Sequence, residues 1–440
     1  MTDGAPTIAA IIDRKPLGLF QLRIVFLCLL TQLVDGFDNQ ASAFVAPTLA
    51  HQWNVPREAF GQAFSAGAFG TMIGCLLIGP LGDLLGRKTV IISSLLLAAA
   101  LMALTGSVTN LEQLTLIRFL TGMPLGVLIP ATVVTASEWA PARGRAAIVT
   151  IMACGFSLGA MLGGLTSSVL LPHFPWASVF HLGAAVTLLV GIAALIGMPE
   201  SLRYLSQRGD VEGRARVEAL ARRFDPNIGE LAIVAPARQP RGLRLVTELF
   251  VERRGVMTLL LWGIFFMNAL ALNFMTFWLP SILEQMGMTL PVALRTSTLF
   301  QFGGLCGIVS IGLLAIRLGA RQLILTVSLV AVAAVACVGL LDAMGRNMAI
   351  FAAGFCLIGI QMSMAAFTAT LYPTQVRSTG TSWALGIGRL GSTVGPLIGQ
   401  MLIGWHWEPG RVFPSIALAS VCASICLLFL TLTQRAAAAR

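Results

Sequence analysis

The sequence predicts an all-α membrane protein in which twelve transmembrane helices form two pseudo-symmetric six-helix bundles. Three observations predict this fold. Of the 440 residues, 56% are hydrophobic and only 11% are charged, whereas soluble domains carry about 25% charged residues. Apolar stretches of about 20 residues, the length of a membrane-spanning helix, recur along the chain. The second half of the sequence also repeats the residue spacing of the first half.

The apolar stretches number twelve, and each is continuous. They occupy residues 22–47, 59–81, 89–108, 112–135, 146–171, 177–198, 256–283, 293–316, 322–342, 347–371, 379–402 and 412–433. This continuity favours helices, because the strands of a β-barrel alternate apolar and polar residues over segments of about 10. The first twenty residues lack the apolar core and cleavage site of a secretory signal, so we expect the first span to be an uncleaved targeting signal.

The basic residues indicate how the spans are oriented. The net charge is +10, and only Arg118 and Arg389 fall well inside spans, away from their ends. With a cytoplasmic N-terminus, the outer loops and the outer ends of the spans hold only Arg57, Arg295, Arg346 and Arg411. Because basic residues are retained on the cytoplasmic side, we expect a multi-pass inner-membrane protein with both termini in the cytoplasm. The positive charge therefore reflects topology and does not indicate nucleic-acid binding.

The chain divides into two halves around a polar segment. Residues 200–254 are rich in charged side chains and separate the sixth span from the seventh. We therefore expect an N-terminal bundle over residues 1–199, a cytoplasmic linker over 200–254 and a C-terminal bundle over 255–440.

A shift of 232 or 233 positions aligns the first half with the second. It places Pro47 on Pro280, Gly79 on Gly312, Gly86 on Gly319, Lys88 on Arg321, Pro141 on Pro373, Arg145 on Arg377, Gly159 on Gly391 and Gly163 on Gly395. A nearly constant offset across distant positions indicates a true internal repeat. Parallel six-helix repeats are typical of transporters that bind their substrate near the midplane, between the two halves.

The stretch Val34–Gln40, inside the first span, contains two acidic residues. Asp35 and Asp38 are three residues apart and share a helix face. A carboxylate at bilayer depth costs about 2.5–3.5 kcal/mol, so the two acids are expected to carry a proton, bind a cation or balance a buried cation. Arg118 and Arg389 are the buried cations, and a guanidinium also matches a substrate carboxylate. We expect all four residues around one cavity; the alternative is a structural Asp–Arg pair that only fixes packing.

A glycine-rich loop over residues 79–88 joins the second and third spans on the cytoplasmic side. Its glycines permit a tight turn, and its acid, Asp83, can contact a helix N-terminus or an arginine of the other half. The pattern G-x-x-x-D-x-x-G-R-K is similar to the loop signature of the major facilitator superfamily. We expect a conformational latch made of Gly79, Asp83, Gly86, Arg87, Lys88, Glu138, Arg145 and Arg377.

Further motifs resemble those of the aromatic acid:proton symporter family within that superfamily. The most specific is Asp35-Gly36-Phe37-Asp38 in the first span. The others lie at residues 118–122, 138–141, 199–201, 278–280, 372–380 and 384–389. The resemblance covers essentially the whole chain. It implies import of benzoate-like acids with protons, and a part in transport for the matched acidic and arginine positions.

Other side chains are expected to contact the substrate besides Arg118 and Arg389. Asn268 takes the place of Asp35 in the repeat and is a neutral hydrogen-bonding candidate. Phe37, Phe274 and Trp383 are candidates for stacking on an aromatic ring. No metal or cofactor is expected, because all eight cysteines lie in apolar spans without a metal-ligand spacing.

The sequence therefore predicts a secondary transporter that imports an aromatic carboxylate with protons. A proton on Asp35 or Asp38 would release an arginine, which then binds the substrate carboxylate. The expected partners are the small acid, protons and the lipid bilayer, and the protein is expected to be a monomer. Alternatives are a transporter of another organic anion, a sugar or a drug, a receptor, and a membrane enzyme, for which no nucleophile–base set is present.

Overall fold

The computed structural model describes residues 12–13, 17–208, 217–220, 222, 244–251, 254–373 and 375–438. Throughout these residues the regular elements are helices. The interior of the predicted linker, residues 209–216, 221 and 223–243, lies outside the described part of the chain.

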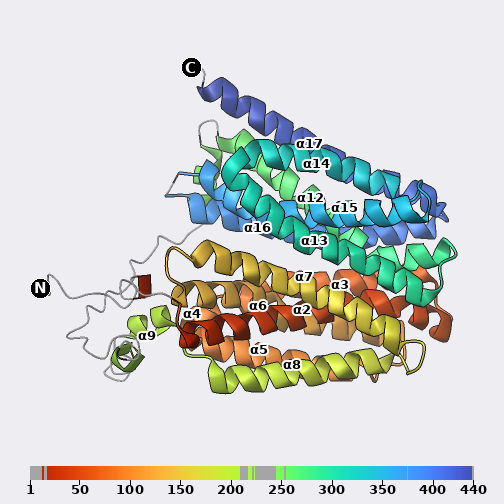
Figure 1. Ribbon diagram of the computed structural model, residues 1–440, viewed down its shortest axis with the longest axis horizontal. Coiled ribbons are helices and arrows are strands. Elements are labelled where there is room, and N and C mark those ends of the chain that lie inside the picture. Colours follow the sequence, from red (N-terminus) through yellow and green to blue (C-terminus); the bar gives the residue numbers. More distant parts are fainter. Residues whose placement is uncertain are drawn as a thin grey trace, which may run out of the picture.

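The first bundle consists of six long helices from the N-terminal half. They are α2 (Leu19–Trp53), α3 (Phe60–Leu77), α5 (Arg87–Thr105), α6 (Leu111–Trp139), α7 (Arg145–Leu170) and α8 (Ala177–Gly197). Three short helices accompany them: η1 (Arg57–Ala59), α4 (Leu81–Leu85) and α9 (Leu202–Arg208). This bundle forms the lower half of the molecule in Figure 1.

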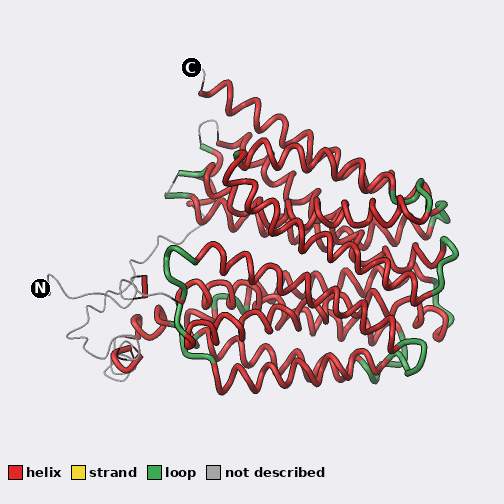
Figure 2. Tube along the Cα trace, viewed as in Figure 1, coloured by secondary structure: helices red, strands yellow, loops and turns green. Residues whose placement is uncertain are grey.

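The second bundle consists of six long helices from the C-terminal half. They are α12 (Arg254–Gln285), α13 (Leu290–Leu318), α14 (Ala320–Cys337), α15 (Ala343–Leu371), α16 (Arg377–Gly404) and α17 (Pro409–Ala438). The short helices α11 (Arg244–Thr247) and η2 (Glu248–Phe250) precede α12. The long helices of both bundles run roughly along the long axis of the molecule and are joined by loops at its two ends (Figure 2).

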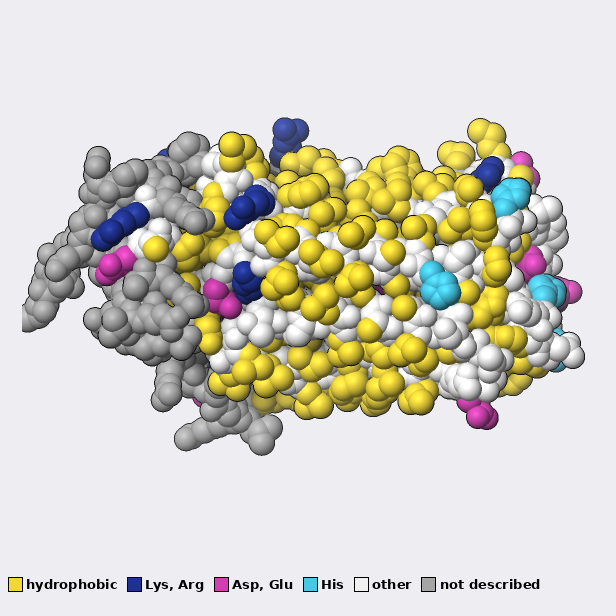
Figure 3. Space-filling model, turned by 90° about the horizontal axis from the view of Figure 1, so that it is seen from below, with side chains coloured by type: hydrophobic (Ala, Val, Ile, Leu, Met, Phe, Trp, Pro, Cys, Tyr) yellow, Lys and Arg dark blue, Asp and Glu magenta, His cyan; other side chains and the backbone are white. Residues whose placement is uncertain are grey.

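Each of the twelve predicted spans coincides with one of these long helices, so the predicted fold class is confirmed. Eleven of the described helices are long and apolar enough to cross a bilayer. The twelfth, α16, has 28 residues but is rich in Gly, Ser and Thr. Apolar side chains cover the middle of the surface in Figure 3, and most charged side chains visible there lie toward its two ends. Such a belt is the surface that lipid requires.

The internal repeat is preserved in local geometry. Helices α6 and α15 both have 29 residues and begin with a side-chain cap, Asn110 in α6 and Asp342 in α15. Each cap accepts a hydrogen bond from the backbone N–H three residues later, at 2.9 and 3.0 Å. Gly86 and Gly319, which are 233 positions apart, have φ angles of 93° and 83°. Only glycine adopts this conformation without strain, which explains why the repeat retains it.

Close approach of backbones fixes the helix that carries the acidic residues. A Cβ atom added to Gly36 of α2 would overlap the carbonyl of Phe156 in α7. A Cβ on Gly159 of α7 would likewise overlap the carbonyl of Leu33 in α2. Small residues permit this backbone-to-backbone packing in membranes. The same contact recurs in the second bundle between Gly391 and the Phe266 carbonyl, in agreement with the repeat, which places Gly159 on Gly391.

The two ends of the molecule differ in their elements. Helix α2 begins and α17 ends at the end that carries α4 and α9, which we call the α9 end (Figure 1). The opposite end carries η1 and the loop between α12 and α13, and we call it the η1 end. Helix α13 approaches α7 toward the η1 end and diverges from it toward the α9 end.

We predict that Gly36→Ala destabilises the protein by about 1–3 kcal/mol, because the added methyl group cannot fit against the α7 backbone. The measurement is the thermal unfolding temperature of the purified protein in detergent. Gly386→Ala is the matched control, since nothing lies within 4 Å of a Cβ at that position. Equal unfolding temperatures for the two variants would contradict the close contact between α2 and α7.

Candidate functional site

A buried ion pair lies at the centre of the first bundle. Arg118 of α6 donates to both carboxylate oxygens of Asp38 in α2, at 3.0 and 2.9 Å. Its Nη2 also donates to the backbone carbonyl of Asp38, at 3.3 Å. The two side chains are only 6% and 3% exposed. This bidentate geometry is the strongest form of Arg–carboxylate contact and pairs both charges inside the bundle.

Asp35 lies one turn before Asp38 on α2 and differs from it in its contacts. It is 3% exposed, yet it accepts no hydrogen bond from any described residue. Its electrostatic neighbours are Asp38 and Arg389, the latter from α16 of the second bundle. An ionised carboxylate without hydrogen-bonding partners is costly in such a site. The structure therefore brings Asp35, Asp38, Arg118 and Arg389 together where the two bundles meet.

A small cavity adjoins this cluster on the side of the first bundle. Arg118 lies on its wall together with Asn39 and Ser42 of α2, and Phe277 of α12 closes it from the second bundle. The cavity has space for about one water molecule. A benzoate-sized molecule does not fit there, so Arg118 is not open to such a ligand in this conformation.

Asn268 lies inside the second bundle and makes its contacts there. Its Nδ2 donates to the carbonyl of Leu357 at 3.2 Å and to Oε1 of Gln361 at 2.8 Å, both in α15. It also lines a small cavity among α12, α14, α15 and α17. The repeat correctly places it at the depth of Asp35, but its amide bonds to α15 and not to the first bundle.

The three aromatic rings expected at the site occupy separate places. The Phe37 ring lies against Gly163 and Gly183, within the first bundle. Phe274 is fully buried in the core. Trp383 is 40% exposed and stacks on Trp262, with ring centroids 5.8 Å apart. Phe37, which is half-buried, and Phe274 therefore serve packing here, and Trp383 is the most exposed ring of the three.

Two glutamines that the sequence analysis did not single out connect the bundles. Nε2 of Gln40, in α2, donates to the carbonyl of Thr276 in α12 at 2.6 Å. Oε1 of Gln40 accepts from Gln301 of α13 at 3.4 Å. Gln40 and Gln301 are each 3% exposed. A buried amide two residues after Asp38 was the available signal for this contact.

An ionic contact joins the bundles at the η1 end. Arg57 of η1 pairs with Glu284 of α12 at 2.9 Å and donates to the Ser281 carbonyl at 3.3 Å. His51 lies 2.9 Å from Arg57 and 3.5 Å from Glu284. This cluster holds η1 against α12 at the η1 end, and the amide contacts of Gln40 hold α2 against α12 and α13 nearer the middle of the molecule.

Comparison with known proteins establishes the family. Residues 28–396 match the family model described as Major Facilitator Superfamily. The chain belongs to the major facilitator superfamily. Its members are transporters and not enzymes, so the predicted class of protein is confirmed.

The superfamily relatives of this chain include transporters of aromatic acids. The chain is 35% identical to the 4-hydroxybenzoate transporter PcaK of Pseudomonas aeruginosa, over 98% of this chain and 96% of that protein. It is 34% identical to the gallate transporter of Pseudomonas putida, over 95% and 93% of the two chains. It is 28% identical to the benzoate transport protein of Acinetobacter baylyi, over 90% and 85%. The expected resemblance to this group is confirmed.

A solved structure shares the superfamily fold. The xylose transporter XylE from E. coli, in a partially occluded inward open conformation, superimposes with a TM-score of 0.71 at 15% identity. The match covers 92% of this chain and 98% of that one.

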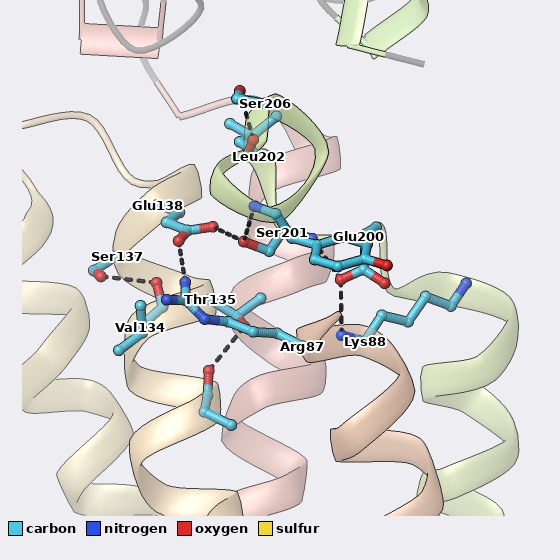
Figure 4. Close-up of polar contacts among 12 residues, drawn as sticks. Arg87, Lys88, Val134, Thr135, Ser137, Glu138, Glu200, Ser201, Leu202 and Ser206 are labelled. Carbon is cyan, nitrogen blue, oxygen red and sulfur yellow. Dashed lines mark hydrogen bonds and ion pairs between the residues drawn. The ribbon is translucent and has the colours of Figure 1, made fainter. Parts of the chain in front are cut away.

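The superfamily loop signature forms part of a charged cluster at the α9 end (Figure 4). Arg87, at the start of α5, donates to Glu138 at the end of α6. The other oxygen of Glu138 accepts from the Ser201 hydroxyl at 2.7 Å. Glu200 accepts from the backbone N–H groups of Lys88 and Ser201, at 3.0 and 2.9 Å. These contacts link α5, α6 and the segment before α9, all within the first bundle.

The remaining residues of the expected latch take equivalent positions in the two bundles. Arg145 donates to the carbonyl of Ala140 at 3.3 Å, and Arg377 donates to the carbonyl of Tyr372 at 3.4 Å. Gly86 places its backbone beside the Glu200 carboxylate, and Gly79 ends α3 against the Cys75 carbonyl. The side chain of Asp83 lies outside the described part of the chain.

We predict that Arg118→Met destabilises the protein by about 3–5 kcal/mol, because it leaves Asp38 buried without its cation. The double variant Arg118→Met with Asp38→Leu removes both charges and should recover most of this loss. Thermal unfolding of both variants in detergent measures the difference. A double variant as unstable as the single one would show that the loss does not come from an unpaired charge.

We predict that Glu284→Gln opens the η1 end more often, because Arg57 loses its ionic partner. The expected effect on local opening is about two- to fivefold, the value of a partly exposed ion pair. Hydrogen–deuterium exchange of residues 51–57 and 281–287 measures it. Glu408→Gln is the control, because Glu408 pairs with Arg411 in full solvent, with both side chains 78% exposed.

Proposed function

We propose that this transporter imports an aromatic carboxylate together with protons by alternating access. The observation that carries the proposal is the cluster of two acids and two arginines at the junction of the bundles, in a chain related to 4-hydroxybenzoate, gallate and benzoate transporters. Intramembrane ionisable residues are functional by default, and a guanidinium matches a carboxylate in shape and charge.

The four residues have different tasks in this proposal. Arg389 binds the substrate carboxylate, because it is half-buried and has no hydrogen-bonded acid among the described residues. Asp35 takes and releases the proton, because none of the described residues donates a hydrogen bond to it. The Asp38–Arg118 pair is bidentate and closed in this conformation, and it exchanges partners when the bundles move.

Proton and substrate are coupled through Arg389. While Asp35 is ionised, it competes with the substrate carboxylate for the guanidinium of Arg389. A proton on Asp35 removes this competition, so the anion binds more tightly. One proton with one monoanion moves no net charge and uses the pH gradient alone. A second proton would add about 2.3 kcal/mol per 100 mV of membrane potential.

The orientation follows from the placement of charge. We infer that the α9 end faces the cytoplasm, because the basic loop with Arg87 and Lys88 lies there. Both termini are then cytoplasmic, and the membrane is the inner membrane. The contacts at the η1 end close the outer side, so the described conformation faces inward. The bundles over residues 1–199 and 255–440 rock as two units, and a monomer suffices for the cycle.

We predict that Asp35→Asn abolishes uphill accumulation driven by a pH gradient. The assay is uptake of labelled 4-hydroxybenzoate into proteoliposomes with an alkaline interior. Exchange of labelled for unlabelled substrate, which needs no net proton movement, should persist. Asp342→Asn is the matched control, because Asn also caps a helix and Asp342 lies at the start of α15.

Two outcomes would contradict the proposal. Uphill uptake that survives in Asp35→Asn would exclude Asp35 as the proton site. An aromatic substrate would be excluded by a competition experiment in which unlabelled benzoate, gallate and 4-hydroxybenzoate all fail to reduce uptake. In that case a sugar or a non-aromatic acid would reduce uptake instead.

A further inference from the structure

A polar strip on the second bundle extends from Arg389 toward the η1 end. Ser392 lies three residues after Arg389 on α16, so the two side chains share a helix face. Nδ2 of Asn273, in α12, donates to the Ser392 hydroxyl at 2.9 Å and to the carbonyl of Ala269 at 2.8 Å. The amide of Asn273 is thus held beside the face of α16 that carries Arg389.

This strip is turned toward the first bundle. Arg389 is an electrostatic neighbour of Asp35 in α2, so its face of α16 is directed at the junction of the bundles. Asn273 is half-buried, as Arg389 is. A carboxylate bound to Arg389 would therefore lie at the same face of α16 as the Asn273 side chain.

One hydrogen-bonding group of the Asn273 side chain, its carbonyl oxygen, is not used within the described part of the chain. Both N–H groups of its amide are used by Ser392 and Ala269. Its Oδ1 accepts no hydrogen bond from any described residue. A side-chain amide can accept as well as donate, so this oxygen can accept a hydrogen bond from a ligand hydroxyl.

The repeat shows that this position has diverged between the bundles. A shift of 233 places Gln40 of the first bundle on Asn273 of the second. Both ends of the Gln40 amide are engaged, with Thr276 and Gln301. The first-bundle amide therefore joins the two bundles, while the Oδ1 of the second-bundle amide accepts no hydrogen bond from any described residue.

The distance between the depths of Arg389 and Asn273 along the helices fits one aromatic ring. Asn273 lies five residues beyond Asn268, the repeat equivalent of Asp35, which is about 7.5 Å along the helix at 1.5 Å per residue. Arg389 lies near the depth of Asp35. The carboxylate and the para hydroxyl of a hydroxybenzoate are separated by one benzene ring, a length comparable with a little over one helical turn.

We propose that Oδ1 of Asn273, oriented by Ser392 and Ala269, accepts a hydrogen bond from a ring hydroxyl of the substrate. Asn273 is thus a specificity-determining residue that favours hydroxylated aromatic acids over unsubstituted ones. This inference rests on the proposed function, because it needs an aromatic acid whose carboxylate binds Arg389.

The test compares two substrates in Asn273→Leu, a substitution of similar volume that removes the hydrogen bond. The half-saturating concentration for 4-hydroxybenzoate uptake into proteoliposomes should rise by about three- to tenfold, the value of one hydrogen bond. The value for benzoate should stay within about twofold, which also shows that the variant is folded. Asn347→Leu is the control, because Asn347 on α15 also has an unpartnered Oδ1 but lies away from Arg389, and it should change neither value.

The outcomes separate the two proposals. Suppose that the unmodified protein takes up both acids. If Asn273→Leu then raises the two half-saturating concentrations equally, or leaves both unchanged, the role of Asn273 is overturned and the proposed function stands. If the unmodified protein takes up neither acid while it transports another compound, both proposals fail.

Discussion

Ionised groups inside a bilayer must find partners, and the architecture of this protein depends on how it meets that constraint. The first bundle neutralises Asp38 with Arg118 through two short hydrogen bonds. Among the described residues, this pair leaves Asp35 with no hydrogen-bonded cation in its own bundle. The cation whose charge acts on Asp35 is Arg389, on the other side of the junction. The second bundle therefore completes the charge balance of the first. As a result, the electrostatic interaction at Asp35 depends on the distance between the two bundles.

The contacts between the bundles include polar and aromatic side chains. Among them are the Gln40 amide, the pair of Arg57 with Glu284, and stacking of Phe64 on Phe277 at 5.0 Å. The charged cluster at the α9 end, by contrast, stays within the first bundle. Hydrogen bonds to side-chain amides and partly exposed ion pairs have small net free energies. Such contacts can form and break within a transport cycle without a large barrier.

The sequence predicted the helices, the repeat and the charged cluster because each follows from the cost of polar groups in lipid. Asp35, Asp38, Arg118 and Arg389 stand out in a chain that is 56% hydrophobic, and buried charges of opposite sign are expected to meet. Gly159 and Gly391 were indicated by the repeat, which aligns them at a shift of 232 positions. These predictions required only position along a helix.

The features that the sequence did not predict depend on rotation of helices and on neighbours distant in the chain. The repeat placed Asn268 at the correct depth, but its amide contacts α15. Phe37 follows Asp35 by two residues, which turns its ring toward the opposite side of α2 and onto Gly163 and Gly183. Neutral amides such as Gln40 and Asn273 cost less in lipid than charges, so composition alone does not mark them.

The low hydropathy of α16 has a consequence for biosynthesis. A helix rich in Gly, Ser and Thr that also carries Arg389 gains little from entering lipid alone. Its glycines allow it to lie directly on α12, where Trp278 donates to the Pro396 carbonyl at 3.0 Å. Because α12 leaves the ribosome earlier, this docking surface is already in place when α16 emerges. The segment that carries Arg389 thus depends on a partner helix for its own insertion.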